Sequence, residues 1–268
     1  MNLTAKDIIH DLELVRARSP LVHNITNYVV MNTTANALLA VGASPVMAHA
    51  AEEVEEMVAI ASVLVINIGT LSEPWVAAMV KAAAAARKKG IPIVYDPVGA
   101  GATPYRTRTI HALLAVAPPA IIRGNGSEIM AVDDDASRTR GVDSAAAAES
   151  ALASARRLSE RFACTVCVSG ETDHIVSKND LALIRNGHAL MPRVTGLGCT
   201  ATALCGAFAA VQPDPFRAAV SAMAVMGMAG EMAAEKSPGP GSLQVHFIDA
   251  LHCLDGHEIE RRLRLEQD

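Results

Sequence analysis

Apolar, β-branched runs alternate with helical stretches over the first two thirds of the chain. Residues 62–68 form a continuous apolar run that predicts a buried strand. Residues 73–89 predict a helix, because basic side chains fill its last turn and Gly90 follows it. The alternation continues with strands expected at 91–97, 120–123 and 164–168, and helices at 108–116, from 127, and at 144–162. It predicts an α/β fold in which helices cover both faces of a mostly parallel central sheet.

The pattern changes toward the C-terminus. Two short strands at 174–176 and 181–184 are typical of an antiparallel meander, and a further short strand is expected at 44–47. Helices are expected at 200–211, 216–236 and 245–262, with a break at 238–241 between the last two. No linker or internal repeat interrupts the pattern, so we expect one domain over residues 1–268.

Composition narrows the class of protein. Of the 268 residues, 51% are hydrophobic and 3% aromatic, which allows a sizeable core and favours a layered α/β body over a β-sandwich. A net charge of −5 without any basic run argues against nucleic acid as a partner. The start of the chain lacks the apolar core of a signal peptide. The apolar stretch at 218–229 is too short to span a bilayer. Five scattered cysteines indicate reduced thiols. We therefore expect a cytoplasmic protein without membrane contact.

Polar, glycine-containing segments follow four of the predicted strands. They lie at 67–70, 96–101, 123–126 and 169–171. Ligands of an open parallel sheet bind beyond the carboxyl ends of its strands, so these segments are expected to converge on one ligand site.

Two carboxylates fall at this edge. Asp96 follows a strand, where it could hold a Mg²⁺-bound phosphate or only cap a loop. Glu128 begins a helix behind Asn125 and Ser127, which is also ordinary capping chemistry. Together they predict a site for a metal ion and phosphate.

Two side chains are candidates for nucleotide contacts. Arg123 lies between a strand and its loop and could fork onto a phosphate, the alternative being a surface salt bridge. Ser169 ends another strand and offers a hydroxyl, although such a position is a plain turn equally often.

The motif Thr195-Gly196-Leu197-Gly198-Cys199-Thr200 leads into a helix of small residues. Glycines before a helix let backbone N–H groups approach an anion, and the helix N-terminus favours negative charge. A thiolate is favoured at such a position, so Cys199 is a candidate nucleophile, base or passive neighbour.

Three further patterns have less specific meanings. Cys164 and Cys167 have C-x-x-C spacing, but on a strand residues three apart point to opposite faces, so we interpret both as buried thiols. Asn27 belongs to a polar run at 23–28 ahead of an apolar helix, and helix capping does not explain all of its amides. Met47 is either a core residue or the soft wall of a ring-binding pocket.

The chain resembles the hydroxyethylthiazole kinase family, within the ribokinase-like superfamily, over nearly its whole length. The resemblance rests on the segments 22–32, 43–47, 67–71, 96–100 and 123–128 and on the Gly-Leu-Gly-Cys turn. It implies a ribokinase-like fold without a separate lid domain. It also implies ATP- and Mg²⁺-dependent phosphorylation of the primary alcohol of 4-methyl-5-(2-hydroxyethyl)thiazole, in thiamine salvage. Leu197 departs from the Thr or Ala that is commoner in the family at this position.

The resemblance assigns roles to residues of this chain. It implies substrate contacts by Asn27, Met47, Gly69 and Gly196, nucleotide contacts by Arg123 and Ser169, and Mg²⁺ and phosphate organised by Asp96 and Glu128. The transferring phosphoryl is expected over the amides of Gly196, Gly198 and Cys199. The family also implies a homotrimer with the substrate pocket at the subunit boundary.

Cys199 occupies the position at which related sugar kinases carry an aspartate base. We expect it beside the substrate hydroxyl, as a weak base or a neutral neighbour. Other functions stay open on the residues alone. One is a cysteine hydrolase in which His23, His49 or His174 activates Cys199. The others are a nucleotide-binding regulator and a kinase of a hydroxymethylpyrimidine or sugar alcohol.

Overall fold

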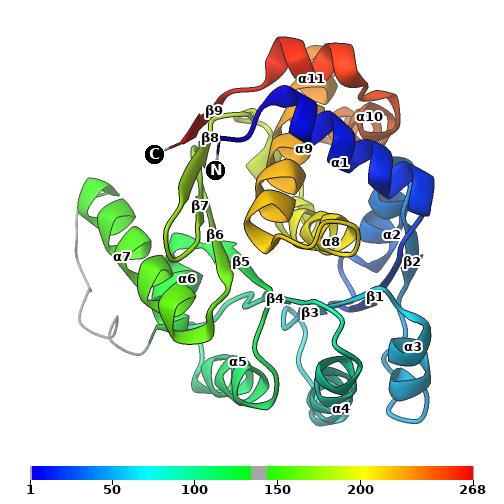
Figure 1. Cartoon of the computed structure of the whole chain (residues 1–268), viewed down its shortest axis with the longest axis vertical. Helices are drawn as coiled ribbons and strands as arrows, with labels where there is room; N and C mark the ends of the chain where they lie inside the picture. The colour runs from blue at the N-terminus through cyan, green and yellow to red at the C-terminus, as the bar shows by residue number, and fades with distance from the viewer. Residues whose placement is uncertain (1, 134–143, 268) are drawn as a thin grey trace.

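The computed structural model describes residues 2–133 and 144–267 (Figure 1). The strands in this part of the chain form one nine-stranded sheet in the order β2-β1-β3-β4-β5-β6-β7-β8-β9. Pairing is parallel from β2 to β6 and antiparallel from β6 to β9, which confirms the mostly parallel sheet and its meander. The strands are β1 Leu21–Ile25, β2 Ser44–Val46, β3 Val63–Asn67, β4 Ile93–Asp96, β5 Ile121–Asn125, β6 Thr165–Ser169, β7 Asp173–Val176, β8 Leu181–Ile184 and β9 Leu265–Gln267.

Helices cover both faces of the sheet, as the pattern predicts (Figure 1). One layer comprises α1 Ala5–Arg18, α2 Met31–Val41, α8 Leu197–Ala209, α9 Pro215–Glu235, α10 Pro240–Cys253 and α11 Gly256–Arg262. The other comprises α3 Val54–Ile60, α4 Glu73–Lys89, α5 Pro104–Val116, α6 Gly126–Val132 and α7 Ser144–Phe162, and a 3₁₀ turn, Met191–Arg193, precedes α8.

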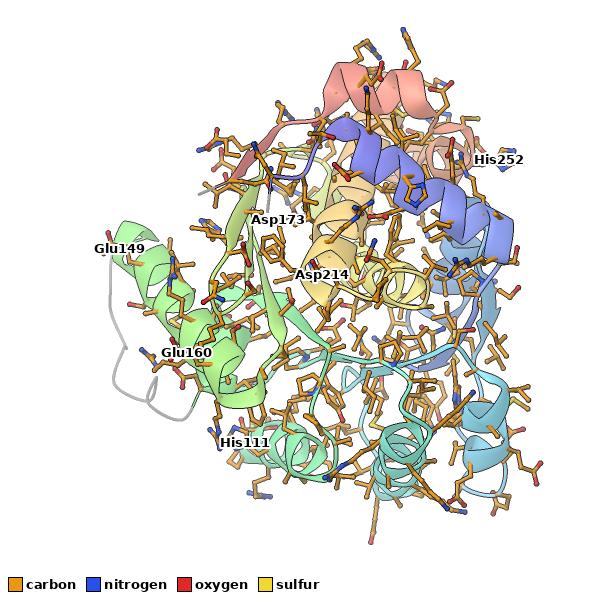
Figure 2. All side chains as sticks on the ribbon, in the orientation of Figure 1. His111, Glu149, Glu160, Asp173, Asp214 and His252 are labelled. Carbon is orange, nitrogen blue, oxygen red and sulfur yellow. The ribbon has the colours of Figure 1, made fainter. Side chains whose placement is uncertain are left out.

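Each helix layer packs on its own hydrophobic core. Along β3, Val63 and Val65 belong to the core under α8 and α9, whereas Leu64 and Ile66 belong to the core over α4 and α5. This alternation follows from the two-residue period of a strand. Side chains fill the space between the ribbons on both faces (Figure 2).

Local signals explain the elements that the sequence predicts well. Helix α4 has the predicted bounds because Pro74 lies in its first turn, three basic residues lie in its last turn, and Gly90 ends it with a φ of 79°. Cys164 and Cys167 are buried free thiols in different cores, which confirms their interpretation.

Other elements differ from the prediction. Elements α1, β1, α3 and β9 were not expected, and β1 escapes the apolar pattern because His23 and Asn24 lie buried within it. Helix α5 begins four residues before the predicted position and α8 three residues before it. The single helix expected at 245–262 is two helices, because Asp255 caps α11 by accepting the Glu258 N–H at 2.9 Å. No helix in the described residues is long and apolar enough to cross a membrane.

Candidate active site

Polar side chains at the ends of β1, β3 and β4 form a hydrogen-bonded chain. Asn67 and Asp96 are register partners on adjacent parallel strands, and Asn67 Nδ2 donates to Asp96 Oδ2 at 2.7 Å. Asn27, just after β1, donates from Nδ2 to Asn67 Oδ1 at 3.0 Å. The Gly69 N–H donates to the same Asn67 oxygen at 2.9 Å. The predicted convergence of strand ends is therefore present in this part of the sheet.

Asn27 links this chain to the start of α8. Its Nδ2 also lies 3.4 Å from Cys199 Sγ, and its Oδ1 accepts the Val29 N–H at 3.1 Å. Both ends of the amide are thus engaged by protein atoms, so Asn27 fixes the turn after β1 against α8.

The first turn of α8 presents backbone N–H donors that have no acceptor within the helix itself. Gly196 is its N-cap with a φ of 85°, and a Cβ there would lie 2.6 Å from Val30 Cγ1, so only glycine fits. Because the helix begins at Leu197, the donors of its first turn are the N–H groups of Leu197, Gly198 and Cys199, with Gly196 just outside it. Predicted ligand contacts of Gly196 itself remain a prediction.

Arg123 extends from β5 toward this turn. Its Nη2 donates to Ser169 Oγ at 2.8 Å, and a Cβ on Gly198 would lie 2.9 Å from its Nη1. Arg123 as a whole residue is 9% exposed, so the alternative of a surface salt bridge is wrong. Burial by itself would lower the pKa of Arg123, but the negative charges of Asp96 and Asp173 raise it by more. The net shift of the pKa is upward, so the guanidinium stays charged.

Asp96 is buried at the centre of the cluster. Its Oδ2 accepts from Asn67 and, at 2.8 Å, from Thr202 Oγ1, whereas its Oδ1 has no partner among the described residues. Burial raises the pKa of Asp96 to about 6, although the charge of Arg123 opposes the shift. A carboxylate with one unsatisfied buried oxygen is suited to an incoming cation or donor.

Glu128 joins α6 to the loop after β4. It accepts the N–H of Asn125 and the N–H of Gly99, both at 2.9 Å, while Asn125 Oδ1 accepts the Glu128 N–H. The capping interpretation of this residue is thus confirmed. The described residues hold no cluster of three or more metal-ligating side chains, and Mg²⁺ at nucleotide sites commonly uses one or two carboxylates together with phosphates.

Cys199 is a neutral thiol in this environment. Burial raises its pKa to about 11, the charge of Asp96 adds to the shift, and contacts with Asn67 and Asn27 oppose it. The expectation that the helix N-terminus favours its thiolate is therefore wrong, because burial and the charge of Asp96 raise the pKa of this thiol rather than lower it.

Met47 lies half-buried after β2, the edge strand beside β1. The next residue is anchored by a 2.7 Å contact between His23 Nε2 and the Ala48 carbonyl oxygen. Near this loop the rings of Tyr28 and His49 lie 4.6 and 4.5 Å from that of Trp75. The sequence did not single out this aromatic group.

Three polar contributors to the site were not predicted individually. Asn67 stands in a predicted strand-end segment, so the expected convergence of strand ends could have placed it near Asp96. Thr202 follows Cys199 by about one helical turn, so helical periodicity could have placed it on the same side of α8 as Cys199. Arg106, whose guanidinium reaches the loop of Gly69, has no signal in the sequence beyond its charge.

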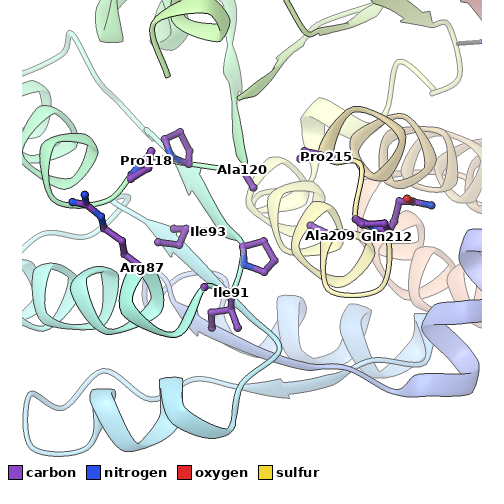
Figure 3. Close-up of a pocket in the computed structure, with 12 residues that line it drawn as sticks. Arg87, Ile91, Ile93, Pro118, Ala120, Ala209, Gln212 and Pro215 are labelled. Carbon is purple, nitrogen blue, oxygen red and sulfur yellow. The ribbon is translucent and has the colours of Figure 1, made fainter. Parts of the chain in front are cut away.

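A separate hollow lies at the opposite end of the sheet (Figure 3). It has a volume of about 490 Å³, and its walls include Ile91 and Ile93 at the start of β4, Ala209 at the end of α8, and Pro215 at the start of α9. None of the predicted site residues line it, and the polar side chains among its lining residues are those of Arg87 and Gln212, with no carboxylate. The site is therefore assigned to the carboxyl edge.

The sheet is mostly parallel and covered on both faces, and a glycine turn, an arginine and carboxylates lie at its carboxyl edge. This is the arrangement expected of an α/β kinase with a ribokinase-like fold. The sequence model described as the Hydroxyethylthiazole kinase family matches residues 12–257, and the chain belongs to this family. A hydroxyethylthiazole kinase of Syntrophus aciditrophicus (strain SB) is 61% identical over 99% of this chain and 98% of the relative. One of Leptospira biflexa is 60% identical over 96% and 97%.

Solved structures with a similar fold include a kinase of the same family. The hydroxyethylthiazole kinase protein of Pyrococcus horikoshii OT3 superposes with a TM-score of 0.91 at 44% identity, covering 98% of this chain and 99% of that one. A pyridoxal kinase of Staphylococcus aureus, solved with AMP-PCP and pyridoxal, has a TM-score of 0.66 at 13% identity, covering 93% and 98%. At that identity the likeness shows the fold alone.

Proposed function

We propose that the protein transfers the γ-phosphoryl group of ATP to the primary alcohol of 4-methyl-5-(2-hydroxyethyl)thiazole, as a step of thiamine salvage. Family membership supports the reaction. The single structural observation that carries it is the first turn of α8, whose N–H groups have no acceptor within the helix and lie beside Arg123 at the sheet edge. Phosphoryl transfer needs this kind of positioning and charge neutralisation rather than covalent chemistry.

The nucleotide would lie across the ends of β5 and β6. Arg123 and Ser169 would contact it, and the amides of Gly198 and Cys199, with Gly196 beside them, would receive the transferring phosphoryl. Since Arg123 is already buried and charged, it would meet the phosphates without an added desolvation step.

The alcohol would lie on the side of β1 and β3. Asn27, Met47, Gly69 and Gly196 would line its pocket. The amide of Asn27 orients Asn67 and the Cys199 thiol, so its main effect would be to hold the pocket walls rigid.

The carboxylates fit Mg²⁺. Asp96 would hold the ion with its unpartnered buried Oδ1, and Glu128, anchored by two backbone N–H groups, would add a second negative charge close by. When bound, Mg²⁺ neutralises the phosphate oxygens of the transferring group. A bound cation would also keep Asp96 ionised, opposing the burial that raises its pKa to about 6.

Cys199 would lie next to the reacting hydroxyl as a neutral neighbour rather than a base. A thiol whose pKa is raised to about 11 is almost wholly protonated at neutral pH. We expect Cys199→Ala to lose less than about tenfold in kcat, whereas loss of a general base costs about 10²–10⁴-fold. Steady-state kinetics of Cys199→Ala and Cys199→Asp test this, and a loss above about 10²-fold in the alanine variant would restore the base role.

A cysteine hydrolase is not favoured. The protonated thiol contacts Asn27, and Nε2 of His23, one of the three candidate bases, is committed to the Ala48 carbonyl oxygen. Family membership likewise does not favour the regulator or a kinase of another small alcohol.

The proposal extends to assembly and location. All described strands belong to one sheet, which supports one kinase domain over residues 1–268. The family resemblance supports a homotrimer with active sites at subunit boundaries, and the five free cysteines support a cytoplasmic location.

A substrate panel tests the function directly. ADP release would be measured with Mg²⁺-ATP and the thiazole alcohol, a hydroxymethylpyrimidine, pyridoxal or a sugar alcohol. We expect the thiazole alcohol to have the highest kcat/KM by at least about tenfold. A higher kcat/KM for another alcohol would overturn the substrate assignment, and no ADP release with any alcohol would overturn the kinase.

A further inference from the structure

Arg106, in the first turn of α5, lies between the loops that follow β3 and β4. Its Nη1 donates to the carbonyl oxygens of Ile68 and Val98, each at 2.8 Å. Its Nη2 donates to the Gly69 carbonyl oxygen at 2.9 Å. One planar group therefore sets the separation of two loops at the edge where the site lies.

The two loops carry different halves of the proposed site. The first contains Gly69, whose N–H is held by Asn67. The second follows Asp96 and contains Gly99, whose N–H donates to Glu128 at 2.9 Å. Gly99 has a φ of 72°, and a Cβ there would lie 3.1 Å from Arg106 Cδ, so this glycine lets the arginine cross the loop.

The partners of Arg106 in the described residues are carbonyl oxygens rather than a carboxylate. A guanidinium can satisfy three acceptors in fixed directions, whereas an ammonium cannot reproduce that planar fork. The arrangement thus depends on arginine in particular and not on positive charge alone.

We propose that Arg106 is a positioning residue for phosphoryl transfer. It holds the loop of Gly69, and with it the alcohol, at a fixed distance from the loop that carries Asp96 and leads to Glu128. That the alcohol and the phosphoryl group are the ligands here rests on the proposed function. Without the guanidinium the loops separate, and the alcohol loses its alignment with the phosphoryl group. Alignment of the reacting groups supplies a large part of the rate acceleration in such reactions.

Arg106→Met and Arg106→Lys test the inference, with Arg108→Met, an exposed position on the same helix, as the matched control. The measurements are kcat, the KM for the alcohol, the Mg²⁺ concentration for half-maximal rate, and the melting temperature. We expect kcat/KM to fall by about 10²-fold in Arg106→Met and about tenfold in Arg106→Lys, with a higher KM for the alcohol. Added guanidinium ion should restore part of the activity of Arg106→Met but leave Arg108→Met unchanged.

Two results would overturn the inference. One is a kcat and KM within about twofold of the parent in Arg106→Met. The other is a lower melting temperature and lower active fraction with an unchanged KM for the alcohol and for Mg²⁺, which indicates a purely structural role. If the parent phosphorylates another alcohol instead, the proposed function fails in the parent, and the ratio of variant to parent on that alcohol still decides the role of Arg106.

Discussion

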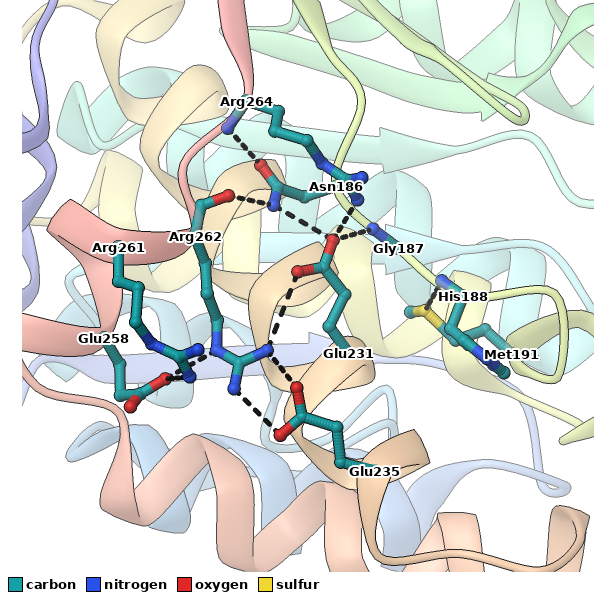
Figure 4. A network of polar contacts seen from close by, with 10 residues as sticks. All are labelled: Asn186, Gly187, His188, Met191, Glu231, Glu235, Glu258, Arg261, Arg262 and Arg264. Atoms are coloured by element: carbon teal, nitrogen blue, oxygen red, sulfur yellow. Dashed lines mark hydrogen bonds and ion pairs between the residues drawn. The ribbon is translucent and has the colours of Figure 1, made fainter.

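The cluster around Asp96 and the charged network at the end of α9 differ in how completely their polar atoms are paired. In the network, Arg262 donates to Glu235 at 2.7 Å and to Glu258 at 2.5 Å, and Glu231 accepts from Asn186 and Arg264 (Figure 4). In the cluster, Asp96 Oδ1 and Arg123 Nε are buried without a partner among the described residues.

The pKa shifts run in opposite directions. Hydrogen bonds from Arg262 and then Arg261 lower the pKa of Glu258 to about 2, so the network favours its charges. Burial raises the pKa of Asp96 to about 6, so the cluster disfavours its charge. The network therefore stabilises the fold, while the cluster holds a charge that costs stability and that a cation can relieve.

The largest expected effect comes from Asp96→Asn. We expect kcat to fall by about 10³-fold, because the variant loses the negative charge proposed to hold Mg²⁺. Its free energy of unfolding at neutral pH should rise by roughly 1–3 kcal/mol, because a buried charge is removed. Kinetics and denaturant titration measure the two, and a variant both inactive and less stable would contradict the comparison.

Arg123→Lys should follow in size. A lysine keeps the charge but cannot fork onto a phosphate and Ser169 together, so we expect kcat/KM for ATP to fall by about 10²-fold. The KM for the alcohol should change little, since the proposed alcohol pocket lies toward β1. A larger change in the KM for the alcohol than in the KM for ATP would contradict the proposed contact of Arg123 with the nucleotide.

Arg262→Met probes the other region. It leaves Glu235 and Glu258 without their shared partner, and we expect a loss of about 2 kcal/mol, or a melting temperature about 5 °C lower. We expect kcat to stay within about twofold of the parent. An Arg262→Met variant that melts like the parent would show that the network contributes no stability.

The smallest effect is a dependence on pH. The pKa of Asp96 is above its unfolded value, so the folded protein binds this proton more tightly and the carboxylate costs stability only as pH rises from about 4 through 6. The stability advantage of Asp96→Asn should thus be full at pH 7.5 and vanish near pH 4. Melting temperatures of the pair across this range check it, and an advantage independent of pH would contradict the assignment to the charge.

How well the sequence predicts each element depends on how local its signal is. Helix α4 is predicted to the residue because its first-turn proline, last-turn charges and ending glycine are neighbours in the chain. Strand β1 is missed because buried His23 and Asn24 interrupt its apolar run, and only its place between β2 and β3 explains them.

The same distinction holds in the site. Strand-end polarity is local, so Asp96, Arg123 and Ser169 could be singled out in advance. The bond between Asn67 and Asp96 depends on strand register, and the raised pKa of Cys199 depends on burial by distant segments. Neither can be derived from residue spacing, which is why a favoured thiolate was expected.

The state of Cys199 has a consequence for inhibitor chemistry. Thiol-reactive electrophiles attack thiolates, and a half-buried thiol with a pKa of about 11 supplies almost none at neutral pH. A warhead aimed at Cys199 would therefore react first with an exposed cysteine such as Cys253. Compounds that block the proposed site should instead carry a hydrogen-bond donor for Asp96 Oδ1, which has no partner among the described residues.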